Sequence, residues 1–215
     1  PDGRKYRYIA NGGTALQEGL IVASEAPVAH HSQDLAVATT AAAASSITVT
    51  LLATLAAKNQ YAEGYLFLNT PTLSTVGSRV AYKIKSHPAA AASATLAVTL
   101  DDGTRIAVTN STETAGLIKN PYHDVVVAPA AIAGRFVGLT VCQIAANYFG
   151  WVQVAGMGFA AIDGTPALGT LVGASGTHAG SLVAVGADTT SALARVHGQD
   201  TTNDEYHSVF LMNLY

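Results

Sequence analysis

The sequence contains little of two things that define particular classes of protein, namely cysteine and charge. Its single cysteine, Cys142, excludes an internal disulfide framework and a metal site built from several thiolates. Because the residues before it are mostly apolar, we expect a buried and inert thiol. Charged residues make up 12% of the chain, against about 25% in typical soluble proteins. So few charges predict that neighbouring subunits cover part of the surface.

The charges that are present argue against nucleic-acid and membrane partners. The net charge is −3, whereas a nucleic-acid-binding domain normally carries a basic patch. Arg4, Lys5 and Arg7 form a short basic cluster, which we interpret as a solvated terminal arm. The uncharged stretch from Leu35 to Ala57 is long enough for a membrane span, but its many serine and threonine residues argue against one. We therefore expect no nucleic-acid partner and no membrane partner.

The clearest strand pattern lies between residues 148 and 172. Apolar and polar residues alternate from Trp151 to Val154, which predicts a strand with the tryptophan on one face. Gly156 then interrupts the pattern, as glycines do at bulges or where two backbones approach closely. A second short run, Phe159 to Ile162, leads into Asp163-Gly164, a dipeptide that predicts a tight hairpin turn.

Short strands separated by turn residues recur along the whole chain, as in β-sandwiches and barrels. Asn11-Gly12-Gly13 predicts a strand pair within residues 1–29, and Asp101-Asp102-Gly103 predicts a hairpin further along. The sequence thus predicts a mainly β fold of short antiparallel strands forming a sandwich or barrel, with an inserted β subdomain. We place the β domain at residues 1–29 plus 128–215, and the inserted β-rich subdomain at 30–127.

Residues that can perform catalysis or bind metals are present, but not in the motifs that do so. None of the seven histidines belongs to an HExxH, HxH or HxxxH pattern. His123-Asp124 has no nucleophile at a motif spacing, and Asp101-Asp102 is better explained by turn chemistry than by general acid–base catalysis. The segment around Ser175 lacks the glycine spacing of a nucleophile elbow. We expect no enzyme activity, no metal site and no cofactor.

Three pieces of the sequence, taken in order, resemble virion structural proteins of tailed bacteriophages, of the head-decoration or capsid-stabilising (cement) kind. The first is the opening DGRKYRYIANGG with LQEGLIV. The second is the middle, QYAEGYLFLN, YKIKSHPAAAASATLAVTL and NPYHDVVVAP. The third is YFGWVQVAGMGFAAIDGTPALGTLV, followed by an apolar strand at the end of the chain. The resemblance spans most of the chain and includes no catalytic signature, so no functional residue carries over from the family.

The resemblance implies a protein on the outer surface of the virion capsid that ties neighbouring capsomers together. It implies two partners, the major capsid protein and copies of the same chain, assembled as a homotrimer. A β protein with few charges and many small residues suits extensive flat interfaces. Trp151 fits a place in the core equally well. The positions that we predict to lie at or near an interface are Arg4, Lys5, Tyr6, Arg7, Tyr8, Tyr148 and Trp151.

Two other functions are weighed against this one. The main alternative is a tail or fibre module for host adhesion that binds carbohydrate. Such a module needs exposed aromatic side chains, whereas aromatic residues are 7% of the chain and the tyrosines are dispersed along it. The third hypothesis is a hydrolase, which would require His123, Asp124 and a further histidine to cluster in the folded chain.

Overall fold

The computed structural model describes residues 3–69, 80–110, 113–131, 134–186, 192–198, 202 and 205–212. Within these ranges the regular structure consists of β-strands and includes no α-helix, so the predicted mainly β fold is confirmed. No helix among the described residues is long and apolar enough to cross a membrane.

The chain forms two compact units, one inserted into the other. The outer unit comprises residues 1–26 and 121–215, and the inserted unit comprises 27–120. The sequence prediction uses the same nesting but places the junctions at 29/30 and 127/128. Val126–Val127 forms β9, which pairs with β2 (Ile21–Ala23) of the outer unit. Val28 packs instead against the core of the inserted unit, which explains the earlier first junction.

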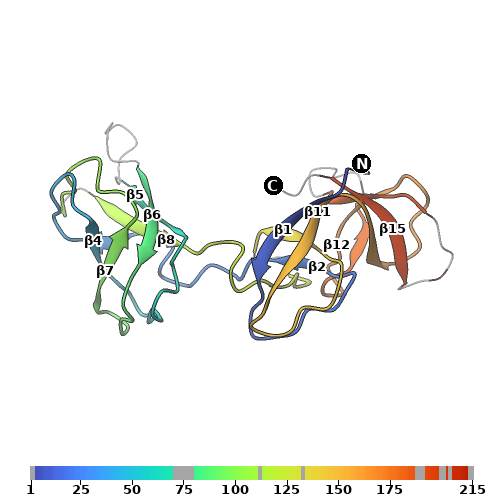
Figure 1. Ribbon diagram of the computed structural model, residues 1–215, viewed down its shortest axis with the longest axis horizontal. Helices are drawn as coiled ribbons and strands as arrows, with labels where there is room; N and C mark the ends of the chain where they lie inside the picture. Colours follow the sequence, from blue (N-terminus) through green and yellow to red (C-terminus); the bar gives the residue numbers. More distant parts are fainter. Residues whose placement is uncertain are drawn as a thin grey trace. The chain divides into compact units, whose positions relative to one another are not determined.

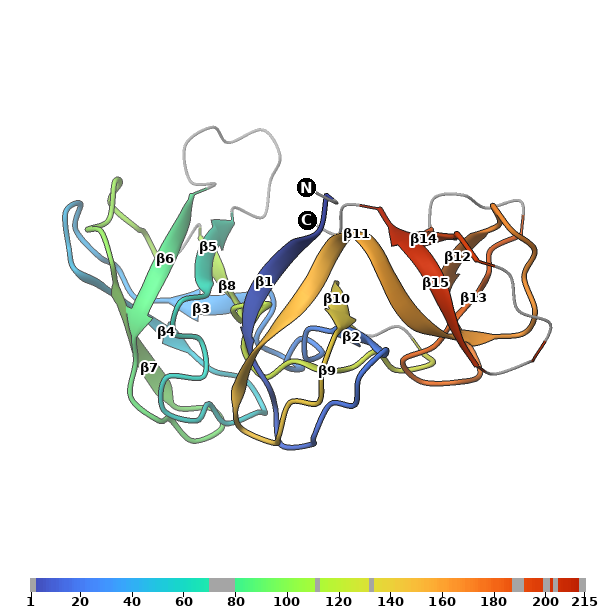
Figure 2. The same cartoon turned by 45° about the vertical axis from the view of Figure 1, so that its right-hand side comes forward.

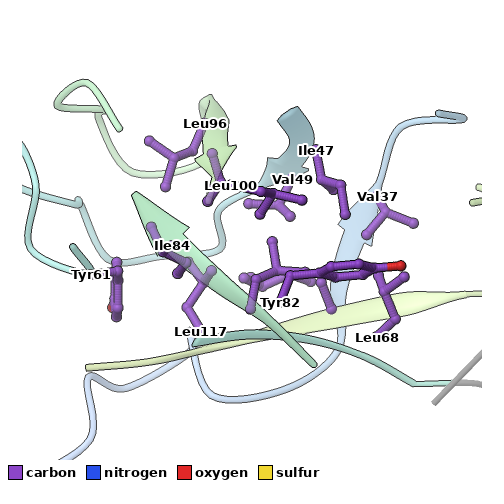
Figure 3. Packing of buried hydrophobic residues seen from close by; sticks show 14 of the residues in the cluster. Val37, Ile47, Val49, Tyr61, Leu68, Tyr82, Ile84, Leu96, Leu100 and Leu117 are labelled. Carbon is purple, nitrogen blue, oxygen red and sulfur yellow. The ribbon is translucent and has the colours of Figure 1, made fainter. Parts of the chain in front are cut away.

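The inserted unit is a closed antiparallel barrel with the strand order β3-β4-β7-β6-β5-β8. Its strands are β3 (Leu35–Val37), β4 (Ser46–Thr50), β5 (Tyr65–Asn69), β6 (Ala81–Ser86), β7 (Thr95–Leu100) and β8 (Thr114–Ile118). Side chains of β4, β6 and β7 alternate between the buried interior and the surface, as strands covering a core must. Figure 3 shows Ile47, Val49 and Ile84 among the side chains that fill this interior.

Two histidines of the inserted unit are buried around Tyr61. His31 Nδ1 accepts a hydrogen bond from the Tyr61 hydroxyl. His31 Nε2 donates a hydrogen bond to the Thr54 carbonyl at 2.9 Å. His87 Nε2 accepts the Tyr61 backbone N–H at 2.9 Å, and its Nδ1 donates to the Pro88 carbonyl at 2.8 Å. Burial lowers the pKa of His87, which keeps the ring neutral, as the hydrogen bond accepted by Nε2 requires. Both histidines therefore hold the barrel together.

The outer unit is built around one long strand, β11 (Phe149–Asp163), which changes partners half-way along. Its first half pairs with β1 and β10, and its second half pairs with β15 and, in parallel, with β13. Figures 1 and 2 show β1 beside the first half and β15 beside the second. The remaining bounds are β1 (Lys5–Ala10), β2 (Ile21–Ala23), β10 (Phe136–Thr140), β12 (Leu171–Ala174), β13 (Leu182–Ala184), β14 (Ala194–Val196) and β15 (Tyr206–Leu211).

Gly156 lies where β11 changes partners. Its φ is +88°, and a Cβ there would lie 2.8 Å from the Arg4 backbone nitrogen. The sequence predicts a bulge or a close backbone approach at this glycine, and the structure shows the backbone of Arg4 lying against it. The strand β11 is not interrupted and continues beyond Gly156. Past Gly156, the pairings β11-β13-β12-β14-β15-β11 close into a ring. Ile162, Leu182 and Val209 are among the apolar side chains buried inside that ring.

The turn residues identify turns correctly but not the strands that these turns join. The predicted pair within residues 1–29 is wrong, because β1 pairs with β11 while β2 pairs with β10 and β9. Asp163-Gly164 leads into β12, which pairs with β13 and β14 and not with β11. Residues 104–109 form no strand after Asp101-Asp102-Gly103, because buried Thr104 bonds to the backbone around Ala44 instead.

Candidate functional site

The pairing of β1 with β11 gathers aromatic side chains that are far apart in the sequence. Tyr8 lies opposite Trp151, and Tyr6 lies opposite Gln153. Directly opposed residues of an antiparallel pair share one face of the sheet. The Tyr8 ring stacks on Phe149, with centroids 5.6 Å apart and planes 3° apart, and lies 5.2 Å from the Trp151 ring. We call Tyr8, Phe149 and Trp151 the aromatic cluster.

The aromatic cluster faces solvent. Tyr8 is 51% exposed, Phe149 63% and Trp151 54%. The suggestion that Trp151 is a core residue is therefore wrong, since the next residue, Val152, points to the opposite face and fills the core instead. Contiguous exposed apolar surface is uncommon on soluble proteins and marks places where something binds. The cluster is thus the first candidate binding surface.

The other predicted interface residues lie around the aromatic cluster. Tyr148 is strongly exposed and comes directly before β11. Arg7 points to the opposite face of β1, where its guanidinium lies 4.2 Å from the centre of the Tyr122 ring. Arg4 and Lys5 are exposed at the start of β1, next to the Gly156 crossing. The sheet therefore brings Tyr6, Tyr8 and Trp151 together on one face and separates Arg7 from them.

A groove lies along the second half of β11, with a volume of about 920 Å³. Its exposed aromatic residues come from three strands, namely Tyr6 on β1, Phe159 on β11 and both Tyr206 and Phe210 on β15. Tyr206 is held by its hydroxyl, which donates to the Glu18 carbonyl at 3.1 Å. The Tyr206 ring packs over Gly19, where a side chain would collide with it.

Sequence reasoning missed four aromatic residues of these two surfaces: Phe149, Phe159, Tyr206 and Phe210. Phe149 and Phe159 lie in the segment that the sequence identifies as strand, and period-two alternation from Trp151 places Phe149 on its face. The groove could not be foreseen, because the pairing of β11 with β15 links residues about fifty positions apart. Cys142 is exposed, contrary to prediction, since β10 ends at the buried Thr140 two residues earlier.

One polar cluster among the described residues contains a serine, a histidine and an aspartate, as a catalytic triad does, but its hydrogen bonds connect them in a different order. The hydroxyls of Ser175 and Thr177 each donate to Asp163 Oδ2 at 2.6 Å, and His178 Nδ1 lies 3.1 Å from the same oxygen. A serine nucleophile is activated by giving its proton to a neighbouring base such as imidazole. Ser175 is buried and bonded to a carboxylate, so this cluster fixes the loop after β12.

Asp163 of this cluster is expected to make the folding stability of the protein depend on pH. Hydrogen bonds from Ser175 first, then from Thr177 and His178, lower the pKa of Asp163 to about 2 from its ordinary 3.8. Because the unfolded chain then binds the proton more readily, the stabilisation is present above about pH 4 and is lost as the pH falls toward 2. We expect the Asp163→Asn variant to lose less folding stability than the intact protein between about pH 5 and about pH 2.5. Urea denaturation of both proteins at about pH 5 and about pH 2.5 measures it, and an identical pH dependence would contradict it.

In the part of the chain that the structure describes, no third residue joins the His123–Asp124 pair that a hydrolase would require. His123 Nδ1 lies 3.2 Å from Asp124 Oδ2, and both side chains are largely exposed. Across the described residues, no three histidine, cysteine, aspartate or glutamate side chains are placed to hold a metal ion. Comparisons with protein-family models, with curated proteins and with solved structures return no match for this chain.

Proposed function

We propose that the protein is a non-enzymatic virion structural protein of a tailed bacteriophage that decorates and stabilises the capsid shell by binding across neighbouring capsomers. The observation that carries the proposal is the aromatic cluster of Tyr8, Phe149 and Trp151. Its three stacked or tilted rings are all about half exposed, on a chain with very few charges. A rigid pair of strands that presents such a surface is suited to bind protein, and the resemblance to decoration proteins supplies the partner, the major capsid protein.

The size of the cluster explains why such a protein would act as an oligomer. Three half-exposed aromatic side chains offer on the order of 300 Å² of ring surface, which is roughly 7 kcal/mol of gross burial energy. Association itself costs about 4 kcal/mol or more, so one cluster alone gives weak binding. Linking several copies, as in a homotrimer, turns weak contacts into strong attachment through effective concentration. Contacts made only on the assembled shell then stabilise that shell by mass action.

The second candidate function, host adhesion from a tail or fibre, is favoured by the groove beside β15. The sequence argument against it was that the tyrosines are dispersed, and the fold brings Tyr6 and Tyr206 together with Phe159 and Phe210 around one hollow. A virion protein can use both surfaces, one toward the shell and one toward another ligand.

The copy number of the protein in purified particles tests the proposed function. Quantitative mass spectrometry against the major shell protein gives this number directly. We expect on the order of hundreds of copies, near-stoichiometric with the shell, as a repeated lattice of binding sites requires. Roughly a dozen copies or fewer would contradict shell decoration and favour a tail or vertex protein. Absence from particles would overturn the virion proposal altogether.

A further inference from the structure

The groove beside β15 has the dimensions and the lining of a ligand site. Its volume of about 920 Å³ falls within the range of roughly 300–1,000 Å³ that is usual for small-molecule sites. Phe159 and Tyr206 are 65% and 55% exposed, and Phe210 is 49% exposed. Aromatic side chains from neighbouring strands are thus about half exposed around one hollow.

A fixed hydrogen-bond acceptor lies in this groove. Gln153 lines it and is only 2% exposed. Its Nε2 donates to the backbone carbonyls of Ala155 at 3.0 Å and of Met157 at 2.7 Å. Both amide hydrogens are therefore used, which fixes the orientation of the side-chain amide. The Gln153 Oε1 lies next to Gly158, another residue of the groove, where it would be 3.2 Å from an added Cβ.

The Gln153 Oε1 is left for a ligand. It accepts no hydrogen bond from the described residues. It is also not fully buried, so a ligand in the groove can reach it. Glu18, also in the groove, has an exposed carboxylate that makes no ion pair or hydrogen bond with another described residue. The groove thus combines ring faces with two acceptor groups, of which the amide oxygen is held rigidly by the backbone of β11.

We propose that this groove binds a saccharide. A sugar ring has an apolar C–H face that packs on Phe159, Tyr206 or Phe210, and it has edge hydroxyls that donate hydrogen bonds to Gln153 Oε1 and Glu18. A purely apolar ligand would bury the Gln153 oxygen without a donor, which costs free energy. The groove is lined by one acidic residue, Glu18, and one basic residue, Arg4. This inference does not depend on the decoration proposal, because the aromatic cluster lies outside the groove.

The test compares two groove phenylalanines with a matched phenylalanine outside the groove. The probes are an array of defined bacterial, plant and animal oligosaccharides and an array of peptides, followed by calorimetric titration with the best-retained saccharide. We expect the intact chain to retain saccharides and the F159S/F210S variant to lose affinity by about tenfold or more. F149S changes an equally exposed residue of the same strand outside the groove and should stay within about twofold.

A second variant keeps the test informative if the phenylalanine variants fold poorly. Glu18→Gln alters an exposed side chain and retains its shape, so the fold is preserved, and we expect a several-fold loss of saccharide affinity. Retention of peptides but not saccharides by the intact chain would overturn the proposal in favour of a protein ligand. Equal saccharide retention by the intact chain and F159S/F210S, or no retention by either, would also overturn it. None of these outcomes depends on the copy number in particles, so this proposal and the decoration proposal can fail separately.

Discussion

Replacing Gly156 with alanine should destabilise the outer unit by more than about 3 kcal/mol. Its φ of +88° is a conformation that residues with a Cβ rarely adopt. The added methyl would also lie 2.8 Å from the Arg4 nitrogen and 2.9 Å from the Gly3 carbonyl carbon. Both atoms belong to the backbone, so no side-chain rotation relieves the contact. The two strands would have to separate where β11 changes from β1 to β15.

A second glycine in the same unit separates strain from crowding. Gly169 has a similar φ of +81°, but a Cβ there would meet nothing within 4 Å. Gly169→Ala should therefore cost only about 1 kcal/mol, the usual penalty for a left-handed residue. Trp151 belongs to the outer unit, so urea unfolding followed by its fluorescence reports on the correct unit. Equal losses in the two variants would show that backbone crowding at Gly156 contributes nothing.

Replacing Tyr61 with alanine should destabilise the inserted unit by about 4 kcal/mol. Tyr61 is among the largest fully buried side chains, and its loss leaves a cavity in the barrel core. The change also removes the hydrogen bond that the Tyr61 hydroxyl donates to His31 Nδ1. The buried ring nitrogen of His31 is then left without a partner. Tyr61→Phe keeps the volume and removes only the hydroxyl, so its expected cost is smaller, about 1–2 kcal/mol.

The matched control for Tyr61 is Tyr65, four residues along the chain. Tyr65 is 46% exposed on β5, so Tyr65→Ala should change stability by less than about 1 kcal/mol. Amide hydrogen exchange along β4 to β8 measures the inserted unit directly, since the single tryptophan reports on the other one. Similar losses of protection in Tyr61→Ala and Tyr65→Ala would contradict the view that burial of Tyr61 stabilises the barrel core.

The sequence predicts strands well because alternation follows from the local geometry of an extended chain. The predicted runs around Trp151 and Phe159 both lie in the long strand β11. Partner choice is set by contacts distant in sequence, which alternation does not encode. A turn at Asp163-Gly164 is compatible with a hairpin, yet β12 has other partners because β15 and β13 already occupy the two edges of β11.

For the candidate site too, some features could be predicted from the sequence and others could not. The structure places Tyr8 and Trp151 opposite each other on one exposed face, and their place at an interface stays a prediction. The role of Gln153 could not be predicted. Its amide is fixed by the carbonyls of Ala155 and Met157, which flank Gly156 with its φ of +88°, and alternation does not encode that conformation. A glutamine in the middle of an apolar strand is nevertheless a signal that sequence analysis can use.

If the aromatic cluster attaches this protein to a capsid shell, as we propose, its three side chains are covered on the particle. Hydroxyl-radical footprinting, read out by mass spectrometry, reports the solvent exposure of individual aromatic side chains and can be applied to the free protein and to purified particles. The account predicts strong labelling of Tyr8, Phe149 and Trp151 in the free protein, where all three are about half exposed, and a several-fold decrease on particles. Unchanged labelling of these three residues on the particle would contradict it.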